Sequence, residues 1–151
     1  MDYLSIKTAI GNIVACADDS ALLSLDFCNE FEYKTTKNRI LNNLEKELAE
    51  YFDGKRKEFD LPLKPVGTPF QLRTWETLGQ IPYGQTVSYA TEATMMGHPK
   101  AVRAVANANG KNKISIIIPC HRVISSNGSI GGYSGGIWRK EFLLKLEQNF
   151  R

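Results

Sequence analysis

Cys120 and His121 are the residues whose types and spacing most favour chemistry, and they follow an apolar run at residues 114–118. A thiol becomes a nucleophile when its thiolate is favoured, and a neighbouring histidine and Arg122 are the kind of surroundings that favour it. The pattern therefore indicates nucleophilic chemistry at Cys120. The ordinary alternative is a cysteine that fills the core beside a buried histidine.

The remaining cysteines and histidines point to no second site. Cys16 and Cys28 lie in or just after predicted strands, with no histidine nearby in the sequence, so we assign them no chemistry. Three cysteines and two histidines, His98 and His121, do not fall at the paired spacings that zinc ligation uses. We expect no metal.

A glycine-rich segment at residues 125–136 follows the cysteine. Glycines let a backbone approach a ligand closely. The segment lacks the Lys-Ser/Thr ending of a phosphate-binding P-loop and the spacing of a dinucleotide fingerprint. We therefore exclude a nucleoside triphosphate or NAD site and expect no cofactor.

Several elements must position the cysteine. The run at residues 114–118 is predicted to be a buried strand that ends at Pro119, and residues 138–150 have the spacing of an amphipathic helix. Residues 88–95 and 100–109 predict two short helices about a break, the layout of a helix-turn-helix. Helical hairpins that pack only against their own protein have the same layout.

The first part of the chain has a different pattern. Short alternating runs predict strands, a three-to-four repeat predicts a helix that ends at Asp53-Gly54, and a segment with three prolines marks a boundary. Thr68-Pro69 then begins a helix. The strands are residues 3–8, 13–17 and 21–27, the helices 37–52 and 70–81, the boundary segment 55–69, and the predicted domains 1–66 and 67–151.

The predicted fold class is therefore mixed α/β: a small strand-and-helix domain, then a mostly helical, winged-helix-like domain. Charge divides the same way. Residues 1–66 hold nine Lys and Arg against twelve Asp and Glu, a net charge of −3, and residues 67–151 hold ten against four, a net charge of +6. A polyanionic partner for the second part and a solvated basic face explain this charge equally well.

Neither a membrane segment nor a signal peptide is expected. No stretch approaches the roughly 20 apolar residues that a spanning helix needs, and no basic flank with an apolar run opens the chain. The odd number of cysteines favours a reducing compartment. Together these features predict a cytoplasmic protein.

Three motifs at matching spacing carry a family resemblance. They are Pro-Cys-His-Arg-Val at residues 119–123, Gly-Tyr-Ser-Gly-Gly at residues 132–136 and Lys-Glu-Phe-Leu-Leu at residues 140–144. The chain resembles the O6-alkylguanine-DNA alkyltransferases, also called methylated-DNA–protein-cysteine methyltransferases. The resemblance is dense over residues 67–151, and over residues 1–66 it extends only to length and the order of strands and helix.

The resemblance implies that Cys120 takes an alkyl group, mainly methyl, from O6 of guanine in DNA and keeps it permanently, in a single turnover. O4 of thymine is a second candidate atom. It also implies that His121 takes the thiol proton through a water, that Glu147 orients the imidazole and that Asn112 braces the turn that carries the cysteine.

The family's partner is double-stranded DNA that contains O6-alkylguanine, bound by a monomer from the minor groove with the damaged nucleotide flipped out. Arg103 resembles the arginine that fills the space of the flipped base, and Lys100 projects from the same predicted helix. Tyr89 is expected to crowd the phosphate and donate to the base. Further contacts are expected from the carbonyls of Cys120 and Val123, the side chain of Tyr133 and the backbone N–H of Ser134.

Two other functions stay open at this stage. One is a protein that only recognises lesions or regulates transcription, and the other is a Cys-His hydrolase that acts on a small molecule. The chain keeps Cys120 where alkyltransferase-like binders have tryptophan, so transfer is expected. It also lacks the cysteine and histidine set of the zinc site that some relatives carry in the N-terminal part.

Overall fold

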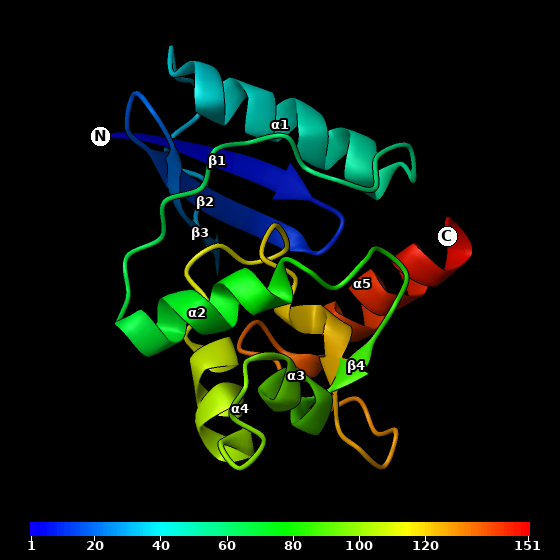
Figure 1. The fold of residues 1–151 in the computed structure, drawn as a ribbon. Helices are drawn as coiled ribbons and strands as arrows, with labels where there is room; N and C mark the ends of the chain where they lie inside the picture. The colour runs from blue at the N-terminus through cyan, green and yellow to red at the C-terminus, as the bar shows by residue number, and fades with distance from the viewer. The chain divides into compact units, whose positions relative to one another are not determined.

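The computed structural model describes residues 1–151 as two compact units, which are described separately. The first unit contains Met1–Val66 and Lys113–Ser115, and the second contains Gly67–Asn112 and Ile116–Arg151. Figure 1 shows the strands of the first unit in blue and the helices of the second in green to red. No helix has the length and apolar character needed to cross a membrane.

The first unit is a three-stranded antiparallel sheet covered on one face by a helix. Strands β1 (Asp2–Thr8), β2 (Gly11–Ala17) and β3 (Leu22–Cys28) pair in chain order, and α1 (Arg39–Phe52) packs on β1 and β2 (Figure 1). Apolar residues spaced three and four apart give α1 its buried face. The three strands and the helix predicted from the sequence are confirmed.

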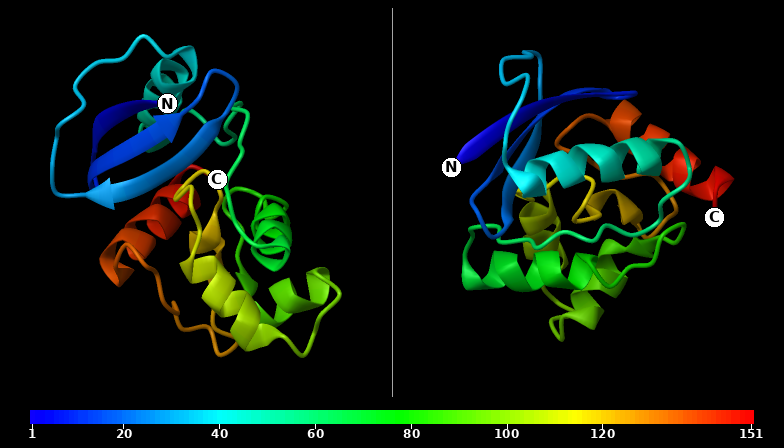
Figure 2. Two further views of the ribbon diagram at one scale, coloured as in Figure 1. Left: turned by 90° about the vertical axis from the view of Figure 1, so that its left-hand side faces the viewer. Right: turned by 90° about the horizontal axis from the view of Figure 1, so that it is seen from above.

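The second unit contains the remaining helices and a small two-stranded parallel sheet. Its elements in chain order are α2 (Pro69–Leu78), β4 (Val87–Ser88), α3 (Tyr89–Met95), α4 (Val102–Gly110), the 3-10 helix η1 (Cys120–Arg122), β5 (Val123–Ile124) and α5 (Ile137–Asn149). The long orange loop between β5 and α5 is visible in both views of Figure 2. The mixed α/β class is confirmed.

Local signals explain where α2 begins and how it is held. Thr68 accepts from the backbone N–H of Gln71, and the Gln71 side chain accepts from the backbone N–H of Thr68, which makes a capping box ahead of Pro69. Further along α2, the indole of Trp75 donates to the carbonyl of Ala108 at 2.9 Å. This hydrogen bond fixes α2 to α4.

The expected strand at residues 114–118 is wrong. The segment is a series of turns, and its single strand-like bridge joins Ile114 to Leu25. Ile116 adopts φ 72°, a left-handed conformation that is rare for a β-branched residue. All of the run except Ile117 is buried, and a short apolar run cannot distinguish a buried strand from a buried turn.

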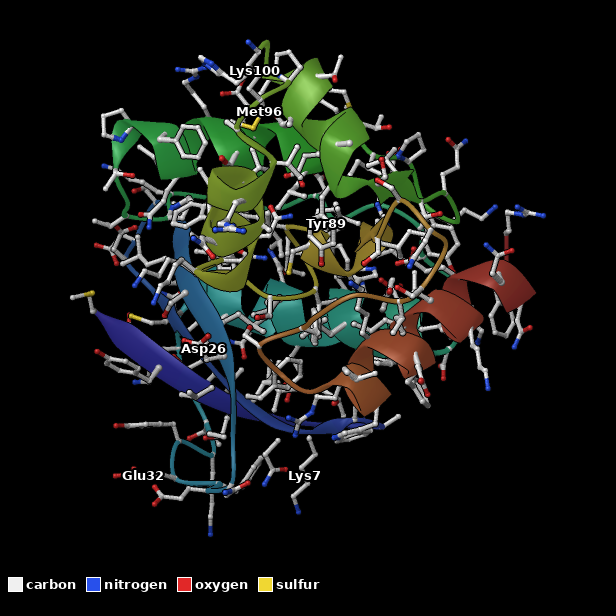
Figure 3. The ribbon with its side chains drawn as sticks, turned by 90° about the horizontal axis from the view of Figure 1, so that it is seen from below. Lys7, Asp26, Glu32, Tyr89, Met96 and Lys100 are labelled. Atoms are coloured by element: carbon white, nitrogen blue, oxygen red, sulfur yellow. The ribbon has the colours of Figure 1, made fainter.

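The second helix of the predicted helix-turn-helix begins two residues later than expected, since α4 starts at Val102. Lys100 therefore lies in the turn that precedes α4, and its placement on the helix is wrong. Figure 3 shows Met96 and Lys100 together at this turn, away from Tyr89. Residues 98–101 form a turn instead, in which the backbone N–H of Ala101 donates to the carbonyl of His98 at 2.9 Å, and the helix begins only after this turn.

Candidate active site

Cys120 lies at a pocket of about 300 Å³ in the second unit. It is the first residue of η1, it is 8% exposed, and it is a free thiol. Residues from α3, α4, η1 and the glycine-rich loop line the pocket: Tyr89, Ala106, Asn107, Asn109, Gly110, Cys120, Gly132, Tyr133 and Ser134. The structure therefore gathers Cys120, Tyr89, Tyr133 and Ser134, all four predicted from the sequence, around one cavity.

Asn112 fixes the turn that presents the thiol. Its Nδ2 donates to the carbonyl of Ile118 at 2.7 Å and to Sγ of Cys120 at 3.3 Å. The backbone N–H of Cys120 donates to the same carbonyl at 2.8 Å. A single amide thus holds both the backbone and the sulfur.

Burial, and not a charged neighbour in the sequence, dominates the pKa of the Cys120 thiol. Burial raises the pKa of Cys120, although the hydrogen bond from Asn112 and the positive charge of Lys140 act in the opposite direction. His121 and Arg122 instead turn toward Glu147. That these two neighbours favour the thiolate therefore stays a prediction.

His121 is fully buried and pairs with a residue from α5. Its Nε2 lies 2.7 Å from Oε2 of Glu147. Arg122 binds the same carboxylate with two nitrogens, Nε to Oε1 at 2.8 Å and Nη2 to Oε2 at 3.0 Å. Its Nη1 donates to the carbonyl of Ile81 at 2.8 Å, so the guanidinium is fixed from two sides.

The charges of this cluster follow from its contacts. Burial alone would raise the pKa of Glu147, but the hydrogen bonds from His121 and Arg122, together with the positive charge of Arg122, outweigh burial and hold that pKa well below its usual range. Burial lowers the pKa of His121 despite the attraction of Glu147. At neutral pH the cluster is therefore a carboxylate, a guanidinium and a neutral imidazole.

This assignment fixes the tautomer of His121. Because Glu147 is a carboxylate and can only accept, Nε2 of His121 must carry the hydrogen. Nδ1 then has the free lone pair, and it is buried with no hydrogen-bond partner in the protein. The imidazole is thus oriented with one basic nitrogen available.

Lys140 is a site residue that the sequence argument missed. It is fully buried on α5, and its Nζ donates to the carbonyl of Val123 at 2.6 Å and to that of Gly132 at 3.0 Å. Burial lowers its pKa to about 8. Its spacing from Leu143 and Glu147, on one helical face, was the available signal.

The glycine-rich loop meets Tyr89 closely. Burial raises the pKa of the Tyr89 phenol, and the nearby backbone of Gly132 acts in the opposite direction. Gly131 has φ +75°, and a Cβ at this position would lie 2.8 Å from Oη of Tyr89. Only glycine fits this backbone conformation and this approach without strain, so the loop and the tyrosine position each other.

The other expected DNA contacts lie outside the pocket. Arg103 is exposed on α4, and Lys100 is exposed in the turn before it. The carbonyl of Val123 already accepts from Lys140. Asn107 and Asn109, which the sequence did not single out, line the pocket wall instead.

The arrangement supplies an acceptor thiol, an oriented neutral imidazole and a closed charge cluster beside one cavity. No group of three or more histidine, cysteine, aspartate or glutamate side chains is placed to hold a metal ion. The geometry fits attack by Cys120 on a group bound in the pocket.

Comparisons with known proteins agree across the whole chain. Residues 69–149 match the family described as 6-O-methylguanine DNA methyltransferase, DNA binding domain, and residues 1–65 match its ribonuclease-like domain. The methylated-DNA–protein-cysteine methyltransferase of Methanosarcina barkeri is 44% identical, covering 99% of this chain and 98% of its own. The constitutive enzyme of Bacillus subtilis is 40% identical, covering 97% and 94%.

A solved structure gives the same result. The crystal structure of Mycobacterium tuberculosis OGT in complex with DNA superposes with a TM-score of 0.90 at 41% identity, covering 98% of this chain and 93% of that one. Sequence and fold agree over nearly the full length, and the chain belongs to the 6-O-methylguanine DNA methyltransferase family.

Proposed function

We propose that this protein repairs DNA by transferring an alkyl group, mainly methyl, from O6 of guanine to Sγ of Cys120. The transfer is irreversible, so each protein molecule acts once. The observation that carries this proposal is the thiol of Cys120 at the pocket. The next residue, His121, has its orientation fixed by Glu147. The names of the relatives support the same reaction.

The chemistry balances without a cofactor. The sulfur attacks the alkyl carbon, a sulfur–carbon bond forms, and the bond from that carbon to O6 breaks. The thiol proton passes through a water to Nδ1 of His121, the departing guanine anion takes up a proton from water at N1 as it returns to the keto form, and the imidazolium then releases its proton to water, so that in net terms one proton moves from sulfur to N1. Since burial raises the pKa of the thiol, removal of this proton by the base is a required part of the step.

The neighbours of the thiol take supporting roles. Asn112 holds Sγ, and Glu147 keeps Nε2 of His121 protonated. Tyr89, Tyr133 and Ser134 line the cavity, which supports assigning them contacts with the base. We assign the carbonyls of Cys120 and Val123 to the exocyclic amine, with Val123 shared between that amine and Lys140.

Double-stranded DNA is the proposed partner. A base in the helical stack cannot reach a buried thiol, so the damaged nucleotide must be flipped out. The net charge of +6 on residues 67–151 supports phosphate binding, and α3 and α4 are the proposed helix-turn-helix. α4 carries the exposed Arg103 among small alanines, which suits insertion into the minor groove and occupation of the vacated space.

The remaining expectations belong to the same proposal. Residues 67–151 carry the transfer, and residues 1–66 form a separate domain. O4 of alkylated thymine is a second candidate substrate atom. We further propose a monomer in the cytoplasm, supported by the free state of all three cysteines.

The test is the mass of the intact protein after incubation with a duplex oligonucleotide that holds one O6-methylguanine, followed by peptide mapping. We expect a gain of one methyl group, confined to Cys120 and ending at one per protein. A parallel duplex with O4-methylthymine measures the second substrate. Repeated turnover would indicate a hydrolase, and DNA binding without a mass gain would indicate a lesion-recognition protein.

Two variants separate the roles. Cys120→Ala should bind lesion DNA and gain no mass, while Cys28→Ala, which removes a half-buried cysteine, should react as the unaltered protein does. Arg103→Ala should repair duplex DNA more poorly than free O6-methylguanine base. Equal losses on both substrates would contradict a flipping role for Arg103.

A further inference from the structure

Residues 67–151 contain four acidic residues, and two of them are buried in different surroundings. Glu147 is bound by Arg122 and His121. Glu92, on α3, has no exposed surface, and its one side-chain hydrogen bond comes from an uncharged amide, Nδ2 of Asn109, at 2.7 Å. A buried carboxylate without a cation is costly, so the ionised form is disfavoured at Glu92.

Two unsatisfied atoms belong to this same pair. Oε2 of Glu92 and Oδ1 of Asn109 are both buried and have no hydrogen-bond partner. Both atoms are acceptors when Glu92 is ionised. A proton on Oε2 turns it into a donor, and Oδ1 is the second polar atom of the amide already bound to Oε1. The neutral acid can therefore pair with Asn109 through two parallel hydrogen bonds, which satisfies both atoms.

The elements that pack against α3 bring no charged side chain that would stabilise the ionised form of Glu92. α3 packs on α2, α4, β4 and β5. The buried faces of α2 and α4 carry no charge, because Arg73, Glu76 and Arg103 lie on exposed faces, and the two strands contain no titratable residue. The titratable groups that interact with Glu92 are Tyr89 and Cys120. Burial raises the pKa of Glu92 to about 7.

The pair lies at the reacting centre. Asn109 is part of the pocket wall that also contains Cys120. Burial is the main cause of the raised pKa of the Cys120 thiol, and a negative charge on Glu92 raises it further. Loss of the Glu92 proton would therefore break a hydrogen bond to Asn109 in the pocket wall. The new negative charge would at the same time disfavour the thiolate of Cys120.

We propose that Glu92 is a positioning residue for alkyl transfer, which as a neutral acid fixes the amide of Asn109 in the pocket wall and keeps negative charge away from the thiol. This role rests on the proposed function, since it concerns the rate of transfer to Cys120. Release of the proton makes transfer slower than it would be with a neutral side chain.

Glu92→Gln tests the role, because glutamine presents the same donor and acceptor as the neutral acid at every pH. The measurement is the single-turnover rate of methyl transfer for Glu92→Gln divided by that of the unaltered protein, from about pH 5.5 to about pH 8.5. We expect a ratio near one at the acid end that rises about two- to fivefold across about pH 7. Glu76→Gln, an exposed glutamate on α2, should give a ratio of one throughout.

A flat ratio for Glu92→Gln overturns the role, whereas absence of transfer in the unaltered protein overturns the proposed function instead. Infrared spectra give a second test that needs no activity. At about pH 6 a protonated carboxyl band should be present in the unaltered protein and shift in Asn109→Ala, which keeps Glu92 but removes its partner. A spectrum without such a band, or a band that Asn109→Ala leaves in place, contradicts the pairing.

Discussion

Oε2 of Glu147 lies 2.7 Å from Nε2 of His121, and both groups are almost completely buried. The two residues are 26 positions apart in the chain. This contact sets the tautomer of the histidine, because a carboxylate can only accept. The same carboxylate neutralises Arg122, so one side chain of α5 both orients the base and balances the buried charge.

Glu147→Gln is expected to be damaging in two ways. It leaves the buried guanidinium of Arg122 without a counter-charge, which should lower the free energy of unfolding by about 3–5 kcal/mol. It also leaves one amide oxygen in place of two carboxylate oxygens to accept from both His121 and Arg122, so the imidazole loses its charged acceptor and transfer to Cys120 should fall by about a hundredfold or more. Chemical denaturation and single-turnover transfer measure the two effects.

Glu141→Gln is the matched control, because Glu141 is an exposed glutamate on the same helix. The pH dependence of the unfolding free energy gives a second test of the Glu147 cluster. A carboxyl whose pKa is lowered by folding stabilises the protein above its usual value of 4.5, and this contribution is lost as the pH falls below that value. The decrease in the free energy of unfolding at acid pH should therefore be smaller in Glu147→Gln than in the unaltered protein. An equal decrease in the two proteins would contradict the stabilisation of the Glu147 carboxylate by His121 and Arg122.

Gly131→Ala should impair transfer through Tyr89. The new Cβ would lie 2.8 Å from Oη of Tyr89, and the backbone has φ +75°. Gly128→Ala is the control. Gly128 has a similar φ of +86°, but a Cβ added there would have no other atom within 4 Å. The control should cost about 1 kcal/mol of unfolding free energy and leave transfer intact. Equal transfer rates in the two variants would show that the close approach to Tyr89 is unimportant.

Lys140→Met should slow transfer by about tenfold, because it removes a positive charge that lowers the pKa of Cys120. It also releases the carbonyls of Val123 and Gly132 from their shared donor. Lys145→Met changes the net charge equally at an exposed position of the same helix. The pH dependence of thiol alkylation by iodoacetamide compares the two, and identical profiles would exclude an effect of Lys140 on the thiol.

Glu92→Gln should also change stability with pH. A carboxyl whose pKa rises from 4.5 to about 7 on folding stabilises the folded state fully below 4.5, and this contribution is lost as the pH rises through about 7. The loss amounts to about 3 kcal/mol, which glutamine does not incur. Urea unfolding at about pH 8 should therefore find the variant more stable than the unaltered protein, and a less stable variant would argue against a neutral acid.

Local signals predicted much of the fold. Thr68 and Pro69 mark the start of α2 because a cap and a first-turn proline act within a few residues. The strands of the first unit were predictable because buried apolar residues recur at every second position, as Leu4 and Ile6 do in β1, although the residue between them is buried as well. The strand predicted at residues 114–118 was wrong, because apolar character indicates burial and not the conformation of the backbone.

The site was predictable only in part. The motif singled out Cys120 and His121. Their contacts with Asn112 and Glu147 could not be predicted, because the periodicity of a sequence does not show which segments lie together in the fold. Lys140 and Glu92 were missed because charged residues are ordinarily placed at the surface. Their burial depends on carbonyl and amide partners that only the folded chain supplies.

The turn at Ile116 has a consequence for the unfolded protein. Residues 114–118 read Ile-Ser-Ile-Ile-Ile, which has high strand propensity, no charge and no proline, the composition of a segment that self-associates between chains. In the native state this run is buried except for Ile117, and the left-handed residue at its centre prevents it from forming an extended strand. Heating releases both restraints at once. We therefore expect thermal denaturation to end in aggregation, with a midpoint that depends on scan rate and protein concentration.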